Sequence, residues 1–148
     1  MIPESERVLI DTNVLVYATF EDFEPEKHIR CLEILNELNQ SENQLFVSSQ
    51  VLREFYAIVT NSKIFPKPLT IKQALHKIRE FLMRFSLVIE KETTLHVLIS
   101  LLERYAVSRQ KIHDMNIVAT MVDSGIFHLF TYNVQDFTQI REIQLLQL

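Results

Sequence analysis

The stretch Val8-Leu9-Ile10-Asp11-Thr12-Asn13 decides the fold class of this chain, because an apolar run ends there in a carboxylate, a hydroxyl and an amide. The apolar residues predict a buried β-strand that ends at Ile10. In a parallel α/β sheet, ligands bind in the crevice at the carboxyl ends of the strands, so we expect Asp11 at the mouth of a site. An aspartate in this place is equally typical of a helix cap, and Thr12 and Asn13 are also suited to cap the helix that follows.

The composition is that of an ordinary globular protein. Of the 148 residues, 47% are hydrophobic and 23% are charged, with one glycine and four prolines. This length predicts a single domain that spans residues 1–148. No apolar run approaches the roughly 20 residues of a membrane span, and the first residues lack the basic and then apolar pattern of a signal peptide. We therefore expect a cytoplasmic protein with no membrane segment.

The charge is unevenly distributed along the chain. The net charge of −4 opposes non-specific binding of nucleic acid if the charges are evenly spread. Residues 53–111, however, hold eleven of the fifteen Lys and Arg residues and only five of the nineteen Asp and Glu residues. This segment could bind phosphates, although charge alone favours the interpretation that these are solvated helix faces.

Strand and helix patterns alternate along the sequence. Strands are expected at residues 7–10, 45–48, 86–89, 127–131 and 143–146. Helices are expected at residues 12–20, 25–39, 51–60, 93–102 and 112–123, and one more is capped by Thr70 and runs to about residue 84. Ser49 is suited to cap the helix at 51–60, and Gly125 to end the helix at 112–123, where positive φ is useful. This alternation is typical of the α/β class, with a mostly parallel sheet covered by helices on both faces.

The predicted helix at 25–39 carries an apolar face. Ile29, Leu32, Leu35 and Leu38 have the spacing of one helix face, which we expect to be buried. Cys31, the single cysteine, falls on the apolar side and is expected in the core rather than in a reactive site.

Four acids follow predicted strands or begin predicted helices: Asp11, Glu54, Asp114 and Asp136. Such positions converge on one edge of a parallel sheet, where three or four carboxylates would face one another. Like charges at close range need a proton or a cation between them, and an all-oxygen ligand set suits Mg²⁺ or Mn²⁺. A carboxylate-bound Mg²⁺ is typical of phosphoryl-transfer chemistry, whereas the five histidines show no spacing that predicts a zinc site.

Each acid also has a purely structural interpretation. Glu54 and Asp114 lie in early helical turns, where the helix dipole favours a negative charge. The arrangement of one acid per expected strand end supports a site, whereas no single residue does. Asp22, Asp123 and the glutamates of residues 21–42 lack this placement and are expected at the surface.

Four segments around these acids span nearly the whole chain: Leu9-Ile10-Asp11-Thr12-Asn13-Val14-Leu15, Val51-Leu52-Arg53-Glu54-Phe55, His113-Asp114-Met115-Asn116-Ile117-Val118-Ala119-Thr120 and Leu129-Phe130-Thr131-Tyr132-Asn133-Val134-Gln135-Asp136-Phe137. In this order they resemble the four motifs of the PIN-domain nucleases. Each motif alone is weak, but four in order are a strong signal. The small size is most similar to the VapC-type toxins of type II toxin–antitoxin pairs.

This resemblance implies a three-layer α/β/α sandwich with a central, mostly parallel sheet. It also implies an endoribonuclease that hydrolyses single-stranded or structured RNA with one or two Mg²⁺ or Mn²⁺ ions. Asp11 and Asp114 would bind the metal directly, and Glu54 would bind it or a metal-bound water that attacks the phosphodiester.

Two further groups of residues match the family pattern around these acids. Thr12, Asn13 and Thr131 would support the site through hydrogen bonds. At the position of a fourth family acid this chain has Asn133, which is a departure, because an amide supplies no charge. Asp136 would serve instead or is a loop acid, and a second metal ion therefore stays open.

The partners follow from the same resemblance. Arg53, Lys63, Arg109 and Lys111, in the basic middle segment, are candidates to bind the RNA backbone. The family implies a homodimer and a small antitoxin protein, for which the helices at 25–39 and 49–60 carry enough apolar residues. Tyr17, Phe20, Phe55 and Tyr56 could stack on bases, although aromatic residues at these spacings are more typical of the core.

Two rival functions come from other classes. A catalytically silent PIN-like domain that binds RNA or a protein would keep the fold, and the departure at Asn133 is its support. A phosphatase for small phosphate esters is disfavoured, because Thr12-Asn13 follows Asp11 where the haloacid-dehalogenase-like enzymes place a second aspartate two residues on.

Overall fold

A five-stranded parallel sheet forms the centre of the structure, a computed structural model that describes residues 2–146. The strands are β1 (Arg7–Ile10), β2 (Gln44–Ser48), β3 (Ser86–Val88), β4 (His128–Phe130) and β5 (Gln144–Leu145), in the spatial order β3-β2-β1-β4-β5. Every pairing is parallel, and Leu9 in the central strand is paired with Phe46 on one side and Leu129 on the other. The parallel sheet confirms the α/β prediction.

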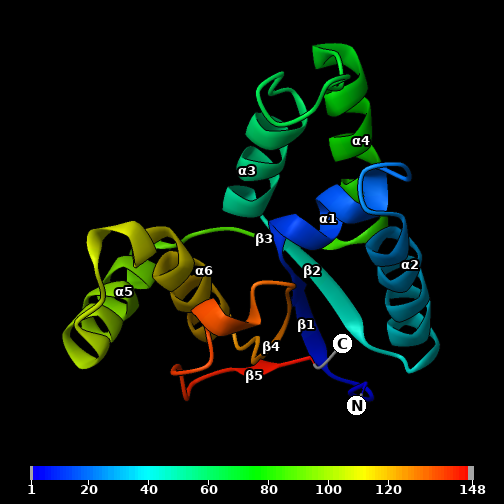
Figure 1. The fold of residues 1–148 in the computed structure, drawn as a ribbon. Helices are drawn as coiled ribbons and strands as arrows, with labels where there is room; N and C mark the ends of the chain where they lie inside the picture. Colours follow the sequence, from blue (N-terminus) through cyan, green and yellow to red (C-terminus); the bar gives the residue numbers. More distant parts are fainter. Residues whose placement is uncertain (1, 147–148) are drawn as a thin grey trace.

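Helices cover both faces of this sheet. They are α1 (Thr12–Thr19), α2 (Pro25–Gln40), α3 (Ser49–Val59), α4 (Ile71–Arg84), α5 (Glu92–Tyr105) and α6 (Ile112–Asp123), with short 3₁₀ helices η1 (Arg109–Lys111) and η2 (Val134–Asp136). The pair α5 and α6 lies on one side of the sheet and α1 to α4 on the other (Figure 1). This arrangement confirms the three-layer α/β/α sandwich. It is the arrangement that the general right-handed crossover rule predicts for a chain that moves outward to β3 and then returns to β4.

The core lies on both faces of the central strand. Val8, Leu9 and Ile10 of β1 are fully buried, which explains why this strand is continuously apolar instead of alternating. None of the helices formed by residues 2–146 is long and apolar enough to cross a membrane.

The helix ends agree with the sequence in two places and differ in one. Thr70 begins α4 with a capping box that Gln73 completes, and Gly125 follows α6 with φ +69°, both as predicted. The prediction that Ser49 caps α3 is wrong, because the cap is Ser48, whose hydroxyl accepts a hydrogen bond from Val51 N at 3.1 Å. Strand β2 therefore passes into α3 without a connecting residue.

The buried face of α2 is only partly the predicted one. Leu35 and Leu38 are buried, but Ile29 and Leu32 are 56% and 41% exposed, and Cys31 and Ile34 take the inner positions instead. Two overlapping apolar stripes exist in this helix, and the stripe that faces inward is decided by its packing against α1 and β2. The prediction that Cys31 belongs to the core is confirmed.

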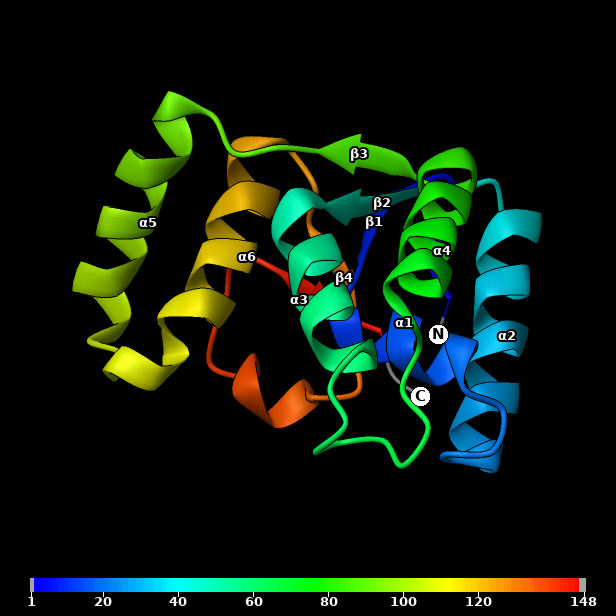
Figure 2. The same cartoon turned by 90° about the horizontal axis from the view of Figure 1, so that it is seen from above.

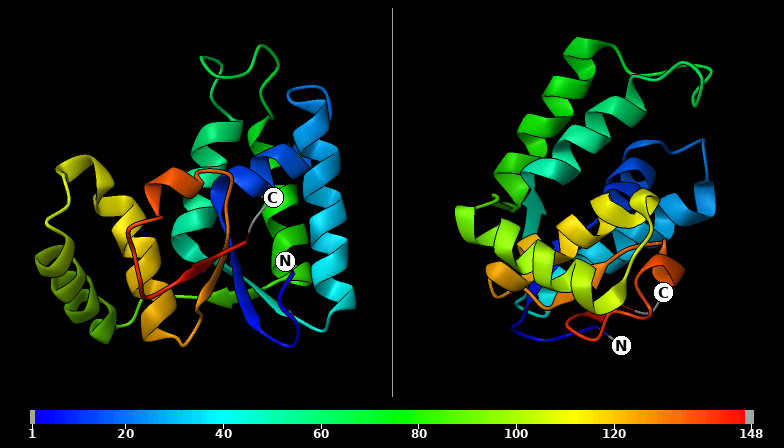
Figure 3. Two further views of the ribbon diagram at one scale, coloured as in Figure 1. Left: turned by 60° about the horizontal axis from the view of Figure 1, so that its bottom comes forward. Right: turned by 90° about the vertical axis from the view of Figure 1, so that its left-hand side faces the viewer.

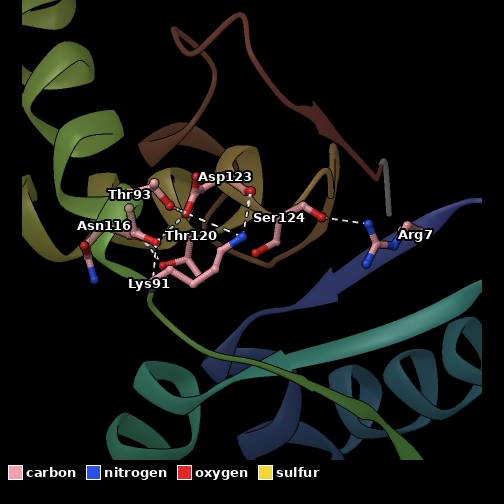
Figure 4. A network of polar contacts seen from close by, with 8 residues as sticks. Arg7, Lys91, Thr93, Asn116, Thr120, Asp123 and Ser124 are labelled. Atoms are coloured by element: carbon pink, nitrogen blue, oxygen red, sulfur yellow. Dashed lines mark hydrogen bonds and ion pairs between the residues drawn. The ribbon is translucent and has the colours of Figure 1, made fainter.

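Asp123 is less exposed than the sequence predicts. Its side chain is only 12% exposed, and its carboxylate accepts hydrogen bonds of 2.8 Å from both Thr93 and Thr94. The hydrogen bond from Thr94 contributes most to holding the pKa of Asp123 below its usual value. Figure 4 shows this network, in which Lys91 also takes part and which ties the end of α6 to the start of α5.

The carboxyl ends of the strands form the edge at which the predicted site lies. From β1 the chain continues to β2 on one side, and from β4 it continues to β5 on the other side. The boundary between β1 and β4 is therefore the switch point of the sheet. Figure 2, seen from above, shows α3 between α6 on one side and α4 and α2 on the other. The side chains that α1, α3 and α6 present at their amino ends therefore meet at this edge.

Candidate active site

Asp11 lies at the end of β1 and is also the N-cap residue of α1. Asp11 is only 5% exposed. Oδ1 accepts the backbone N–H of Thr12 at 2.7 Å, and Oδ2 accepts the hydroxyl of Thr131 at 2.7 Å and the amide of Asn13 at 3.3 Å. The two interpretations of Asp11, as a helix cap and as a site residue, are thus compatible, because one oxygen caps the helix while the other faces β4.

Burial dominates the electrostatics of Asp11. Desolvation raises the pKa of its carboxyl to about 6, and the charges of Glu54 and Asp114 add to this rise. The hydrogen bonds from Thr131 and from Thr12 N oppose the rise without cancelling it. The structure therefore holds a carboxylate where its negative charge is poorly solvated and where a cation would be favourable.

Glu54 reaches the same place from the second turn of α3. Its Oε2 accepts the hydroxyl of Thr12 at 3.0 Å, and its Oε1 accepts the amide of Gln50 at 2.9 Å. Thr12 thus contacts both acids, with its backbone N–H on Asp11 and its hydroxyl on Glu54. Both oxygens of the half-buried Glu54 carboxylate are held by neighbouring side chains.

Asp114 completes the group from the first turn of α6, on the other face of the sheet. Burial raises its pKa above the usual value, and the charges of Asp136 and Glu54 raise it further, against the lowering effect of Lys111. Asp11, Glu54 and Asp114 therefore act on one another electrostatically, although they come from three different helices and strands. The structure brings the three predicted acids to one edge of the sheet.

The donor set fits a hard divalent cation. Within residues 2–146, no three His, Cys, Asp or Glu side chains are close enough to form a ready-made metal cage. Mg²⁺ does not need such a cage, because it commonly keeps several waters and binds one or two carboxylates. The buried Asp11 and the half-buried Asp114, whose raised pKa values reflect an unfavourable negative charge, match that mode of binding.

The two candidates for a fourth ligand are placed differently. Asn133 is exposed, and its backbone N–H donates to the Thr131 hydroxyl at 3.0 Å. Asp136, in η2, accepts a hydrogen bond from Lys111 Nζ at 2.5 Å and forms an ion pair with it. Asp136 is near enough to raise the pKa of Asp114, but its charge is already balanced by Lys111.

The proposed RNA-binding cations are spread along the chain. Arg53, Lys63 and Arg109 are exposed, on α3, on the loop after it and on η1. The charge of Lys111 lowers the pKa of a site acid, Asp114. Beside it, a cavity of about 260 Å³ lies between the segment after α5 and η2, lined by Tyr105, Ala106, Val107, Ser108, Lys111, Met115, Gln135, Asp136, Gln139 and Ile140.

The aromatic candidates belong mainly to the core, as expected. Phe55 is fully buried, and Tyr17, Phe20 and Tyr56 are half-buried against core residues. Tyr17 packs edge to face against Tyr132, with ring centroids 5.1 Å apart.

Three polar residues at the site were not predicted from the sequence: Gln50, Glu90 and Asn116. Gln50 Nε2 donates to Glu54, and Asn116 Nδ2 donates to both Gln50 Oε1 and Glu90 Oε1. The sequence carries a signal for two of them, Gln50 and Glu90, and none for Asn116. Gln50 and Glu54 are four residues apart and so share a helix face, and Glu90 follows a predicted strand in the same way as Asp11 follows its own.

The fold has been seen in solved toxin structures. VapBC2 from Rickettsia felis, bound to a DNA fragment from their promoter, is 23% identical, with a TM-score of 0.63 over 95% of this chain and 97% of that chain. A toxin–antitoxin complex from Klebsiella pneumoniae is 19% identical, with a TM-score of 0.62 over 95% and 96% of the two chains. VapC20 from Mycobacterium tuberculosis, a Sarcin-Ricin loop cleaving toxin, is 11% identical, with a TM-score of 0.68 over 90% and 95%.

The sequence comparison agrees with this likeness. No curated protein matches the sequence significantly. The family model described as the PIN domain matches residues 8–143, a span that contains all four predicted motifs and the three acids of the candidate site. The chain therefore belongs to the PIN domain family.

Proposed function

We propose that this protein is an endoribonuclease that depends on Mg²⁺ or Mn²⁺ and acts as the toxin of a toxin–antitoxin pair. The observation that carries the proposal is the buried carboxylate of Asp11 at the switch point of the sheet, together with the charges of Glu54 and Asp114 that act on it. A site that concentrates negative charge around a desolvated carboxylate is suited to bind a divalent cation and then the phosphate of a substrate.

Asp11 and Asp114 would hold the metal ion, and Glu54 would hold it or one of its waters. When bound, such an ion lowers the pKa of a coordinated water and stabilises the charge that develops on the phosphate. The chain itself fixes the orientation of the acids. Thr131, Asn13 and the Thr12 backbone hold Asp11, while the Thr12 hydroxyl and Gln50 hold the two oxygens of Glu54.

RNA is the proposed substrate, and the cytoplasm the proposed place of action. One solved structure of the same fold is a Sarcin-Ricin loop cleaving toxin, which supports this choice of substrate. Lys111 lies close enough to influence Asp114 and is suited to contact a phosphate next to the cleaved one. The exposed Arg53, Lys63 and Arg109 are further candidates for the backbone of the RNA.

An antitoxin is the proposed protein partner, and a homodimer the proposed assembly. A similar fold was solved as a toxin–antitoxin complex, which supports the first proposal. The helices α3 and α4 extend beyond the sheet (Figure 3), and an apolar groove on them is lined by Leu52, Arg53, Tyr56, Leu75 and Ile78. This groove is suited to cover the apolar face of a partner segment.

The test is cleavage of a mixed RNA pool with and without Mg²⁺ or Mn²⁺. The wild type would be compared with Asp11→Asn and Asp114→Asn, and with Asp22→Asn, an exposed loop acid, as the matched control. We expect cleavage that requires the metal, that both site variants lose and that the control keeps. A folded wild-type protein that neither cuts RNA nor binds the metal would instead favour a silent binding module, for which the uncharged Asn133 is the structural support.

A further inference from the structure

Gln50 connects the two halves of the candidate active site. It lies in the first turn of α3 and is only 5% exposed, although its side chain is polar. Its Nε2 donates one hydrogen bond of 2.9 Å to Glu54 Oε1 and another of 2.9 Å to the backbone carbonyl of His113. His113 directly precedes Asp114, so Gln50 joins Glu54 on one face of the sheet to the helical turn that carries Asp114 on the other face.

Asn116 holds Gln50 in place from behind. Its Nδ2 donates to Gln50 Oε1 at 2.8 Å and to Glu90 Oε1 at 2.5 Å. Glu90 lies two residues after β3, at the same edge of the sheet. Four side chains thus form a continuous chain of hydrogen bonds from Glu90 through Asn116 and Gln50 to Glu54.

The direction of this chain is fixed by its ends. The Glu54 carboxylate and the His113 carbonyl can only accept, so the amide nitrogen of Gln50 must face them and its oxygen must face Asn116. The Glu90 carboxylate can also only accept, so the nitrogen of Asn116 must face both Glu90 and Gln50. Each amide group therefore has one arrangement that satisfies all of its neighbours, and turning either one would set two acceptors against each other.

We propose that Gln50 and Asn116 are positioning residues of the site, which fix the Glu54 carboxylate relative to Asp114. The proposal rests on the proposed metal-dependent function, because it assigns these two amides the task of keeping Glu54 and Asp114 in register for one ion. Partners that orient metal ligands in this way commonly change metal affinity or activity by about 10- to 100-fold when they are replaced.

Asn116→Asp is the informative variant, because charge and positioning predict opposite changes in the affinity for the metal ion. The change adds a negative charge near the acid cluster, and charge alone would strengthen cation binding. The positioning role predicts the reverse, since a carboxylate at residue 116 would face the oxygens of Gln50 and Glu90. Gln50 would have to turn, and its oxygen would then face Glu54 and the His113 carbonyl.

The experiment is a calorimetric titration of the metal-free protein with Mn²⁺ alone, with the thermal midpoint of each variant measured beside it. Asn43→Asp is the matched control, because Asn43 is also a buried amide, 8% exposed, that donates to two backbone carbonyls, those of Pro3 and Leu38, at the opposite edge of the sheet. We expect Asn116→Asp to weaken Mn²⁺ binding by about 10-fold or more. We expect Asn43→Asp to lower the thermal midpoint but to leave Mn²⁺ binding at the wild-type level.

Two further variants keep the test decisive. Glu90→Gln retains an acceptor oxygen for Asn116 and is expected to bind Mn²⁺ as the wild type does. Asn116→Ala removes the contact without adding charge and is also expected to weaken Mn²⁺ binding. It takes the place of Asn116→Asp in the test if that variant fails to fold. Wild-type affinity in the folded Asn116 variants would overturn the positioning role alone, whereas a wild-type protein that binds no Mn²⁺ would overturn the proposed function and the positioning role with it.

Discussion

The hydroxyl of Thr131 donates a hydrogen bond of 2.7 Å to the carboxylate of Asp11, although the two residues are 120 positions apart in the sequence. The same hydroxyl accepts hydrogen bonds from the Asn13 amide at 3.1 Å and from the Asn133 backbone N–H at 3.0 Å. One fully buried oxygen atom therefore joins the ends of β1 and β4 at the switch point of the sheet.

Replacing this hydroxyl by a methyl group, as in Thr131→Val, is expected to destabilise the fold. The change removes one hydrogen bond each from the Asp11 carboxylate, the Asn13 amide and the Asn133 backbone N–H, and such a loss at a buried group costs about 1 to 3 kcal/mol. The pKa of Asp11 is also expected to rise further, because the Thr131 hydrogen bond lowers it. Urea unfolding of the metal-free protein measures the first effect. Thr131→Ser keeps the hydroxyl and is the control, so equal stability of the two variants would contradict this account.

The raised pKa of Asp11 makes the stability of the metal-free protein depend on pH. In the unfolded chain this carboxyl titrates near its usual value of 3.8, and in the folded protein at about 6. Between these values the folded state binds the proton more tightly, so the contribution of Asp11 to stability is greatest at low pH and is lost as the pH rises to about 6. The lost contribution amounts to about 3 kcal/mol.

The measurement is the free energy of unfolding from about pH 4 to pH 7, for the wild type and for Asp11→Asn. The asparagine does not titrate, so the stability of the wild type is expected to fall relative to that of the variant as the pH rises. Asp114, whose pKa is also raised, contributes a change of the same sign in both proteins. Parallel curves for the two proteins would show that Asp11 does not carry this effect.

The sequence predicts those parts of the site that local pattern determines. The position of Asp11 is predictable because the end of an apolar strand and the start of a helix are both local signals. A parallel sheet then brings the carboxyl ends of its strands to one edge. Glu54 and Asp114 follow from the same reasoning, since each lies in an early turn of a helix that begins at this edge.

Other features depend on contacts that no local pattern encodes. The hydrogen bond between Gln50 and Asn116 exists only once α3 and α6 are brought together, which happens because β3 lies beyond β2 and the chain returns across the sheet. The prediction of the buried face of α2 is partly wrong for the same reason. Ile29 and Cys31 are equally plausible inward residues before α1 is packed against the helix. Asp123 lies outside every motif, and its burial depends on α5.

Mn²⁺ is expected to raise the thermal midpoint of the wild-type protein. A ligand at about 100 times its dissociation constant adds about 2.7 kcal/mol to stability, which for a domain of this size corresponds to a shift of about 5 to 10 °C. Asp11→Asn and Asp114→Asn are expected to lose this shift, because each removes a charge that the ion would neutralise. Differential scanning calorimetry with Asp22→Asn as the control measures it, and an equal shift in all four proteins would place the ion elsewhere.

The ion pair of Lys111 with Asp136 predicts that Asp136 is not a metal ligand. The Lys111 ammonium lies 2.5 Å from the Asp136 carboxylate, so this carboxylate already has a partner and is not free to coordinate the ion. We expect Asp136→Asn to bind Mn²⁺ much as the wild type does and to release Lys111 for contact with a phosphate. The pKa of Asp114 is also expected to fall, because the charge of Asp136 raises it and the charge of Lys111 lowers it. Calorimetric titration with Mn²⁺ and an NMR titration of Asp114 measure the two effects, with Asp114→Asn as the variant that should lose the ion. If Asp136→Asn loses Mn²⁺ as completely as Asp114→Asn does, Asp136 is the fourth ligand and Lys111 must move away from it when the ion binds.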